Sequence, residues 1–271
     1  MLFEIINKAY IINVKSSIYR YNHCLYELQK IPKLNFEIIE AITPNSQEVK
    51  SFYKNNYVKE FPPCFRCNLE LCDHKNNVLI PRQVANFLSF KKVFQKISES
   101  HINEKKLFLV LEDDFVLQKG YKKSFKSLEN YITKKNLINI DEPLLFRIGS
   151  HTRSIKRVNL KFKILGLSTF TYNNYNMANP AFIVNKEYCK LFLNEFKLID
   201  TTSDDYIHKI LCKNFNVKNF SIEPFPISQL SYGSKQNVFK SDINVNTTNK
   251  EDIEKVVNKK EYKDLKKIWS E

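Results

Sequence analysis

Glycine is scarce in this sequence, since only 4 of its 271 residues are glycines. A glycine-rich phosphate loop needs several of them close together, because the backbone must turn sharply and come near the phosphate. Neither a G-x-G-x-x-G fingerprint nor a Walker pattern occurs in the chain. The sequence therefore disfavours a dinucleotide-dependent oxidoreductase and a P-loop NTPase.

Long apolar runs are also missing. No stretch reaches the roughly 18 residues that a membrane-spanning helix needs. The N-terminal region carries Glu4 and Lys8 among its apolar residues and has no small-residue cleavage site, unlike a signal peptide. We expect a cytoplasmic protein whose 6 cysteines are free or metal-bound rather than paired in disulfides.

Acidic residues are outnumbered by basic ones, 29 against 43, which gives a formal net charge of +14. Such a field attracts anions, among them nucleic acid, lipid headgroups and nucleotide phosphates. The charge comes mainly from lysines spread along the chain, without the arginine and aromatic interleaving of RNA-binding surfaces. We expect a solvated surface and no nucleic-acid partner. A basic nucleic-acid-binding protein stays an alternative, and its affinity would fall steeply with salt.

Apolar patterns with strand and helix periods alternate along the chain, and 43% hydrophobic residues suffice for a substantial core. The expected strands cover about 8–14, 35–40, 107–111, 143–149, 181–184 and 217–222, and the expected helices 17–29, 81–97, 119–135, 186–196 and 203–213. This alternation predicts an α/β fold with a mostly parallel central sheet flanked by helices.

We expect one domain over residues 1–245, followed by a C-terminal amphipathic helix over 246–271. Within the domain, segment 42–80 reads as an irregular loop that is broken by prolines. The C-terminal helix would dock onto the domain. Alternatively, its lysines and Trp269 suit a peripheral contact with a membrane surface.

The most informative segment is 107–117, LFLVLEDDFVL, in which Glu112, Asp113 and Asp114 follow five apolar residues. The apolar run suits a central strand, and unpaired carboxylates are too costly to bury at its end. In open α/β sheets the ligand crevice lies beyond the carboxyl ends of the strands. These acids therefore indicate a site for Mg²⁺ or Mn²⁺, ions that bridge phosphates. The alternative is a strand end followed by an acidic helix cap.

A second group of potential metal ligands lies in the irregular loop, at Cys64, Cys67, Cys72 and His74. Zinc takes four such ligands tetrahedrally, so a structural Zn²⁺ could hold this long loop together. Free thiols are the alternative. Either way the cluster would not hold a catalytic Mn²⁺, which prefers oxygen ligands.

Read in order, several segments resemble glycosyltransferase family 25, the lipopolysaccharide and collagen β-galactosyltransferase type. The resemblance is carried by Ile12-Asn13-Val14 at a strand end, Arg20 in the next helix, Phe36 to Ala41, Leu111-Glu112-Asp113-Asp114, Asn179 to Val184, and Gln229 to Ser241. The family's Gly-Glu-x-Gly-Cys-x-x-Ser-His motif corresponds to Arg82 through Phe90. There Ser89 matches, Gln83 replaces the glutamate and Phe90 replaces the histidine.

The resemblance implies a GT-A-like fold and metal-dependent, inverting transfer of a sugar. The donor would be UDP-galactose, the acceptor a glycan or a hydroxylysine-type group, and the cofactor Mn²⁺ or Mg²⁺. The departures at Gln83 and Phe90 keep open a non-catalytic module that binds nucleotide sugars or glycans on the same fold.

By the same resemblance, Asp114 and Glu112 would bind the metal. The donor would be bound by Asn13, Arg20, Ser89, Glu112 and Asp113, although Arg20 could equally be a surface charge. Inversion needs a general base for the acceptor hydroxyl, and Asp204 and Asp205 are the candidates. Their alternative role is to cap the helix that follows them.

Overall fold

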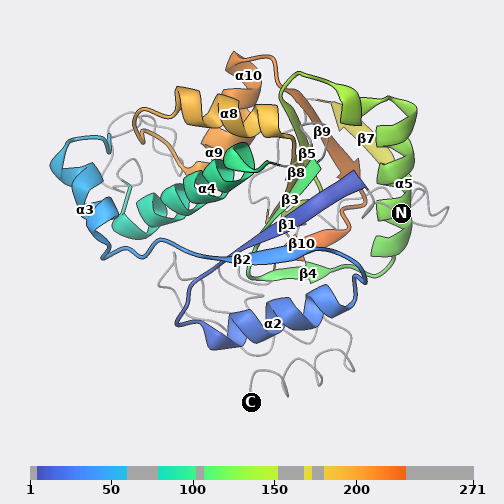
Figure 1. Ribbon diagram of the computed structural model, residues 1–271, viewed down its shortest axis with the longest axis horizontal. Helices are drawn as coiled ribbons and strands as arrows, with labels where there is room; N and C mark the ends of the chain where they lie inside the picture. The colour runs from blue at the N-terminus through green and yellow to red at the C-terminus, as the bar shows by residue number, and fades with distance from the viewer. Residues whose placement is uncertain (1–4, 60–78, 102–106, 152–167, 173–179, 230–271) are drawn as a thin grey trace.

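The computed structural model describes residues 5–59, 79–101, 107–151, 168–172 and 180–229. Within them the central sheet has seven strands in the order β2-β1-β3-β8-β5-β9-β7 (Figure 1). Their bounds, in sheet order, are Phe36–Glu40, Ile6–Asn13, Leu107–Glu112, Ala181–Val184, Leu144–Arg147, Lys218–Glu223 and Thr169–Tyr172. A three-stranded sheet joins β4 (Phe115–Leu117), β10 (Ile227–Gln229) and β6 (Gly149–His151).

Five of the seven strands run in one direction. Strand β1 pairs in parallel with β2 and β3, and β5 pairs in parallel with β9. The exceptions are β8, which lies antiparallel between β3 and β5, and the edge strand β7. The predicted α/β fold with a mostly parallel central sheet is confirmed.

Helices cover both faces of this sheet (Figure 1). One layer contains α4 (Pro81–Glu99), α8 (Lys186–Glu195), α9 (Ser203–Asp205), the π-helical turn η2 (Tyr206–Ile210) and α10 (Leu211–Asn214). The other contains α2 (Ile18–Gln29), α5 (Tyr121–Lys134) and the 3₁₀ turn η1 (Leu137–Asn139). The strand period of two divides β3 between them: Phe108 and Val110 pack with the first layer, whereas Leu109 and Leu111 pack with the second.

Local sequence signals explain the starts of two helices. Pro81 opens α4, and the Gln83 side chain accepts the Ile80 N–H at 2.9 Å, which caps the first turn. Ser46 accepts the Val49 N–H at 3.2 Å and caps α3 (Gln47–Lys54). Helix α3 corrects our expectation that all of segment 42–80 is irregular, because the prolines of that segment lie outside it.

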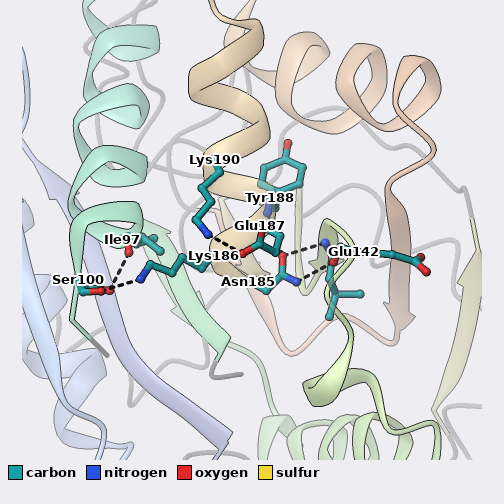
Figure 2. Close-up of polar contacts among 9 residues, drawn as sticks. Ile97, Ser100, Glu142, Asn185, Lys186, Glu187, Tyr188 and Lys190 are labelled. Atoms are coloured by element: carbon teal, nitrogen blue, oxygen red, sulfur yellow. Dashed lines mark hydrogen bonds and ion pairs between the residues drawn. The ribbon is translucent and has the colours of Figure 1, made fainter. Parts of the chain in front are cut away.

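A polar cluster fastens the α4 and α8 layer to the sheet (Figure 2). Asn185 is the N-cap of α8, and its Oδ1 accepts the N–H of Tyr188 and of Leu144, both at 3.0 Å. The ammonium group of Lys186 donates to the carbonyl oxygen of Ser100, just after α4, at 2.8 Å. One short stretch therefore joins the start of α8, the start of β5 and the end of α4.

Two predictions of the sequence analysis lie outside the described residues. They are the zinc cluster of Cys64, Cys67, Cys72 and His74 and the helix over 246–271. In the part of the chain that is described, no helix combines the length and hydropathy needed to cross a bilayer.

Candidate active site

A cavity of about 340 Å³ lies where β1 and β3 end. These two strands are parallel neighbours, with Ile12 opposite Glu112, so their carboxyl ends meet at one edge of the sheet. The start of α2, the loop after β2 and the first turns of α4 form other walls, and Gln229 at the end of β10 completes the lining. The cavity has the position expected of a ligand crevice in an α/β sheet.

All three acids of the EDD sequence line this cavity. Strand β3 ends at Glu112, and the chain turns at Asp113 and Asp114 before β4 begins. An extended strand would have pointed the middle acid away from the other two. The turn instead brings Asp113 and Asp114 to the cavity with little exposure to solvent.

Asp113 connects the residues predicted to bind the donor. One carboxylate oxygen accepts from Nδ2 of Asn13 at 2.9 Å, and the other accepts from Nη1 of Arg20 at 2.6 Å. Its backbone oxygen also accepts from the Cys24 thiol at 3.2 Å. Arg20 is therefore a largely buried partner of Asp113 rather than a solvated surface charge. The contacts fix the end of β1 and the start of α2 against the acidic turn.

Glu112 lies in a strongly acidic environment. Burial raises its pKa well above the usual range, and the charges of Asp114, Asp204 and Asp113 raise it further, while Arg20 acts in the opposite direction. Nε2 of Gln229 donates to its carboxylate at 3.1 Å. Carboxylates gathered in this way repel one another, and a bound cation would relieve the repulsion.

Asp204 approaches this acidic group from another part of the chain. It lies in α9, whose start is tied to α4 because Ser203 Oγ donates to Oδ1 of Asn86 at 2.6 Å. Its charge is close enough to raise the pKa of Glu112. Neither aspartate is the cap of this helix: the N-cap is Thr202, whose hydroxyl accepts the Asp205 N–H at 3.4 Å, and both aspartates lie in the first turn. Asp204, one of the two candidate bases, therefore belongs to the acidic surroundings of Glu112.

Ser89 is buried below the cavity and does not belong to its lining. Its hydroxyl donates to the carbonyl oxygen of Ala85 at 2.7 Å and accepts the N–H of Ile42 at 2.8 Å. Both of those residues line the cavity. Ser89 can therefore influence a ligand through the two walls that it joins.

The departures from the family motif at Gln83 and Phe90 also lie outside the cavity lining. Gln83 caps α4, which a glutamate at this position would do equally well. Phe90 is buried in the core, with its ring near those of Phe94 and Phe182. In this chain both positions have structural roles.

The polar side chains of the lining include Arg82, Asn86 and Gln229, none of which was a candidate site residue from the sequence. Arg82 and Asn86 stand four apart at the start of α4, a spacing that places them on one side of the helix. Gln229 reaches Glu112 across 117 positions of sequence, a distance over which no local pattern could have indicated the contact.

The acids of this site form a partial set of metal ligands. Among the described residues, no group of three or more His, Cys, Asp or Glu side chains is placed to surround one ion. Mg²⁺ in nucleotide sites is commonly held by one or two carboxylates, with substrate phosphates and water completing its coordination. Glu112 and Asp114 fit a cation of this kind, bound together with a phosphorylated ligand.

Comparison with known proteins places the chain among glycosyltransferases. Residues 6–207 match the sequence profile of glycosyltransferase family 25, described as an LPS biosynthesis protein. No curated protein matches the chain significantly. Two solved structures resemble it at 10% identity: the inositol-1-phosphate CTP transferase from T. maritima and the galactosyltransferase LgtC in complex with donor and acceptor sugar analogues. The alignment with the first structure covers 97% of this chain and 96% of the other, with a TM-score of 0.39. The alignment with the second covers 97% of this chain and 95% of the other, with a TM-score of 0.38.

Proposed function

Because the chain belongs to glycosyltransferase family 25, we propose that it transfers galactose from UDP-galactose, with inversion, to a glycan or a hydroxylysine-type acceptor. The observation that carries this proposal is the gathering of Glu112, Asp113 and Asp114 around a cavity at the carboxyl ends of β1 and β3, with Asp204 near enough for its charge to raise the pKa of Glu112. Such a group of carboxylates can hold a cation that binds the donor diphosphate. One of them can also act as the base that removes the proton of the acceptor hydroxyl.

Asp114 and Glu112 would hold Mn²⁺ or Mg²⁺, whose charge would offset the charge that develops on the departing diphosphate. Gln229 would orient Glu112 for this role, because its amide donates to the carboxylate from outside the acidic turn. The raised pKa of Glu112 describes the site without a cation. A divalent ion would favour the ionised form.

Arg20 would bind the nucleotide at the end of the cavity formed by β1 and α2, and Asn13, which is buried outside the cavity lining, would act through its hydrogen bond to Asp113. Asp113 holds the Arg20 side chain in place before any ligand arrives, which lowers the entropic cost of binding. Ser89 would contribute by holding the loop after β2 against α4.

Asp204 would act as the general base. It would take the proton of the acceptor hydroxyl as that oxygen attacks the anomeric carbon, and the bond to the diphosphate would break with its electron pair going to the phosphate oxygen. A single displacement of this kind inverts the anomeric centre.

The proposal is tested by hydrolysis of UDP-galactose, in which water replaces the acceptor. We expect turnover that EDTA abolishes and Mn²⁺ restores, and a loss of at least about 100-fold in the Asp114→Ala variant. Asp141→Ala removes an exposed carboxylate outside the cavity and serves as the matched control.

The outcomes separate the enzyme from a binding module. UDP-galactose that stabilises the wild type against heat without being turned over would indicate a module, since any ligand of the folded state raises its stability. The module was suggested by the departures at Gln83 and Phe90, and neither side chain lines the cavity. A wild type that binds neither UDP nor any UDP-sugar contradicts the proposal as a whole.

A further inference from the structure

Two arginines line the cavity, and their surroundings differ. Arg20 is largely buried and paired with Asp113 at 2.6 Å. Arg82 is exposed at the start of α4, and within the described part of the chain it forms no ion pair or hydrogen bond through its side chain. The cavity therefore contains one guanidinium group that is paired with a protein carboxylate and one that has no such partner among the described residues.

The position of Arg82 is well fixed by its helix. Pro81 before it and the Gln83 cap after it define the first turn of α4. One turn further, Asn86 lies on the same side of the helix and accepts the hydrogen bond from Ser203. Since Ser203 precedes Asp204, the proposed base, Arg82 lies at the end of the cavity where the chemistry would occur.

Charge indicates what this arginine would bind. The acidic wall of Glu112 and Asp114, with the charge of Asp204 near Glu112, repels an anion such as a diphosphate. A cation bound by these acids would offset the repulsion on one side of the diphosphate. Among the described residues on the α4 side of the cavity, Arg82 supplies the positive charge, and a guanidinium forms paired hydrogen bonds with phosphate oxygens.

We infer that Arg82 binds the distal phosphate of the donor, the one bonded to the sugar. The inference rests on the proposed function, because it assumes a nucleoside diphosphate in the cavity. The nucleoside would lie near Val14 and Arg20, and the anomeric carbon near Asp204. The distal phosphate joins these two ends and gains negative charge as the bond to the sugar breaks, so Arg82 would bind more strongly in the transition state than in the ground state.

The test compares the affinities of UMP and UDP, measured by calorimetry with Mn²⁺ present, for the wild type and for Arg82→Ala and Arg82→Lys. We expect Arg82→Ala to weaken UDP binding about tenfold and to leave UMP binding unchanged. Arg82→Lys should lie between, because lysine supplies the charge without the planar pair of donors. Lys126→Ala, which removes an exposed charge from α5, is the control and should bind both nucleotides as the wild type does.

Turnover of UDP-galactose gives a second readout, in which Arg82→Ala should lower kcat more than it raises KM. An equal loss for UMP and UDP, or no loss for either, overturns the inference and leaves the proposed function standing. A wild type that does not bind UDP overturns both.

Discussion

Phe90 shows how a single position can lose a family residue and gain a packing role. The family motif has a histidine here, whereas this chain places an aromatic ring among Phe94 and Phe182 in the core. A histidine in the same place would bury a polar ring among apolar neighbours. The departure is therefore explained by the interior of this protein rather than by its cavity.

We predict that Phe90→His, which restores the family residue, lowers the free energy of unfolding by about 2–4 kcal/mol. It should not raise the turnover of UDP-galactose, because the side chain lies outside the cavity lining. Urea unfolding and the hydrolysis assay measure the two effects.

Gln83→Glu is the matched comparison, since it restores the other departure. Its stability should stay within about 1 kcal/mol of the wild type, because an acid in the first turn of a helix keeps the cap and is favoured by the helix dipole. A gain in turnover from either variant would contradict the structural roles assigned to these residues.

At the scale of the elements, the site depends on how α4 is joined to the loop after β2. Ser89 makes this link, with its hydroxyl between the Ala85 carbonyl oxygen and the Ile42 N–H. The loop contributes Ile42, Thr43 and Pro44 to the cavity. Removing the buried hydroxyl of Ser89 can therefore change the shape of the cavity wall that the loop after β2 forms.

We predict that Ser89→Ala costs about 1–3 kcal/mol of stability, because the Ile42 N–H loses its partner, and that it also weakens UDP binding. Ser98→Ala on the same helix removes an exposed hydroxyl bonded to the Gln95 carbonyl oxygen and is the control. The two variants are compared by urea unfolding and by calorimetry with UDP. A loss of stability with unchanged UDP affinity would show that the loop keeps its place without this bond.

Elements with strong local signals were predictable from sequence. The apolar run of β3, the proline start of α4 and the caps of α8 and α9 depend on neighbouring residues alone. The direction of β8 was not predictable, because a strand buried on both faces shows no alternation and could pair either way. Helix α3 was not predicted, although Ser46 is an ordinary N-cap, because the prolines of segment 42–80 were taken to exclude a helix anywhere in it.

In the candidate site, too, features with a local sequence signal were predictable and contacts between distant residues were not. The acidic triplet was found because three adjacent acids after a buried strand are a local signal. The pairing of Asp113 with Arg20, and of Gln229 with Glu112, joins residues 93 and 117 positions apart. Only the folded topology determines which of these distant side chains meet, and so Arg82, Asn86 and Gln229 were not expected in the lining.

At the scale of the whole molecule, buried histidines couple the fold to pH. Burial lowers the pKa of His23 to about 4, and it lowers the pKa of His208 as well. His23 belongs to α2, and its Nε2 is 2.6 Å from the carbonyl oxygen of Phe115 at the start of β4. The neutral ring can donate this bond, whereas the charged ring would have to be desolvated.

The unfolded chain binds a proton at His23 near pH 6.5 and the folded chain only near pH 4. The contribution of His23 to stability is therefore fully present above about pH 6.5 and is lost as the pH falls toward 4, by about 3 kcal/mol in total. We predict that the unfolding free energy of the wild type, minus that of His23→Gln, falls by this amount between pH 6.5 and pH 4. Urea unfolding of both proteins at several pH values across this range measures the difference.

Taking the difference removes the contributions of other groups. Glu112 acts with the opposite sign, since its raised pKa makes the fold lose stability as the pH rises above the usual carboxyl range. A difference that does not vary with pH would show that His23 is not the neutral, buried group described above.

The contacts of Asp113 determine which substitutions in the acidic run can test catalysis without also disrupting the fold. Its carboxylate accepts hydrogen bonds from Asn13 on β1 and Arg20 on α2 and so has a structural role, whereas Glu112 and Asp114 are the acids proposed to bind the cation. Replacing Glu112, Asp113 and Asp114 together would leave the buried guanidinium of Arg20 without the carboxylate of Asp113. The protein would then lose stability as well as activity. An inactive triple mutant would thus reveal nothing about catalysis, and only replacements at the two flanking acids can separate folding from turnover.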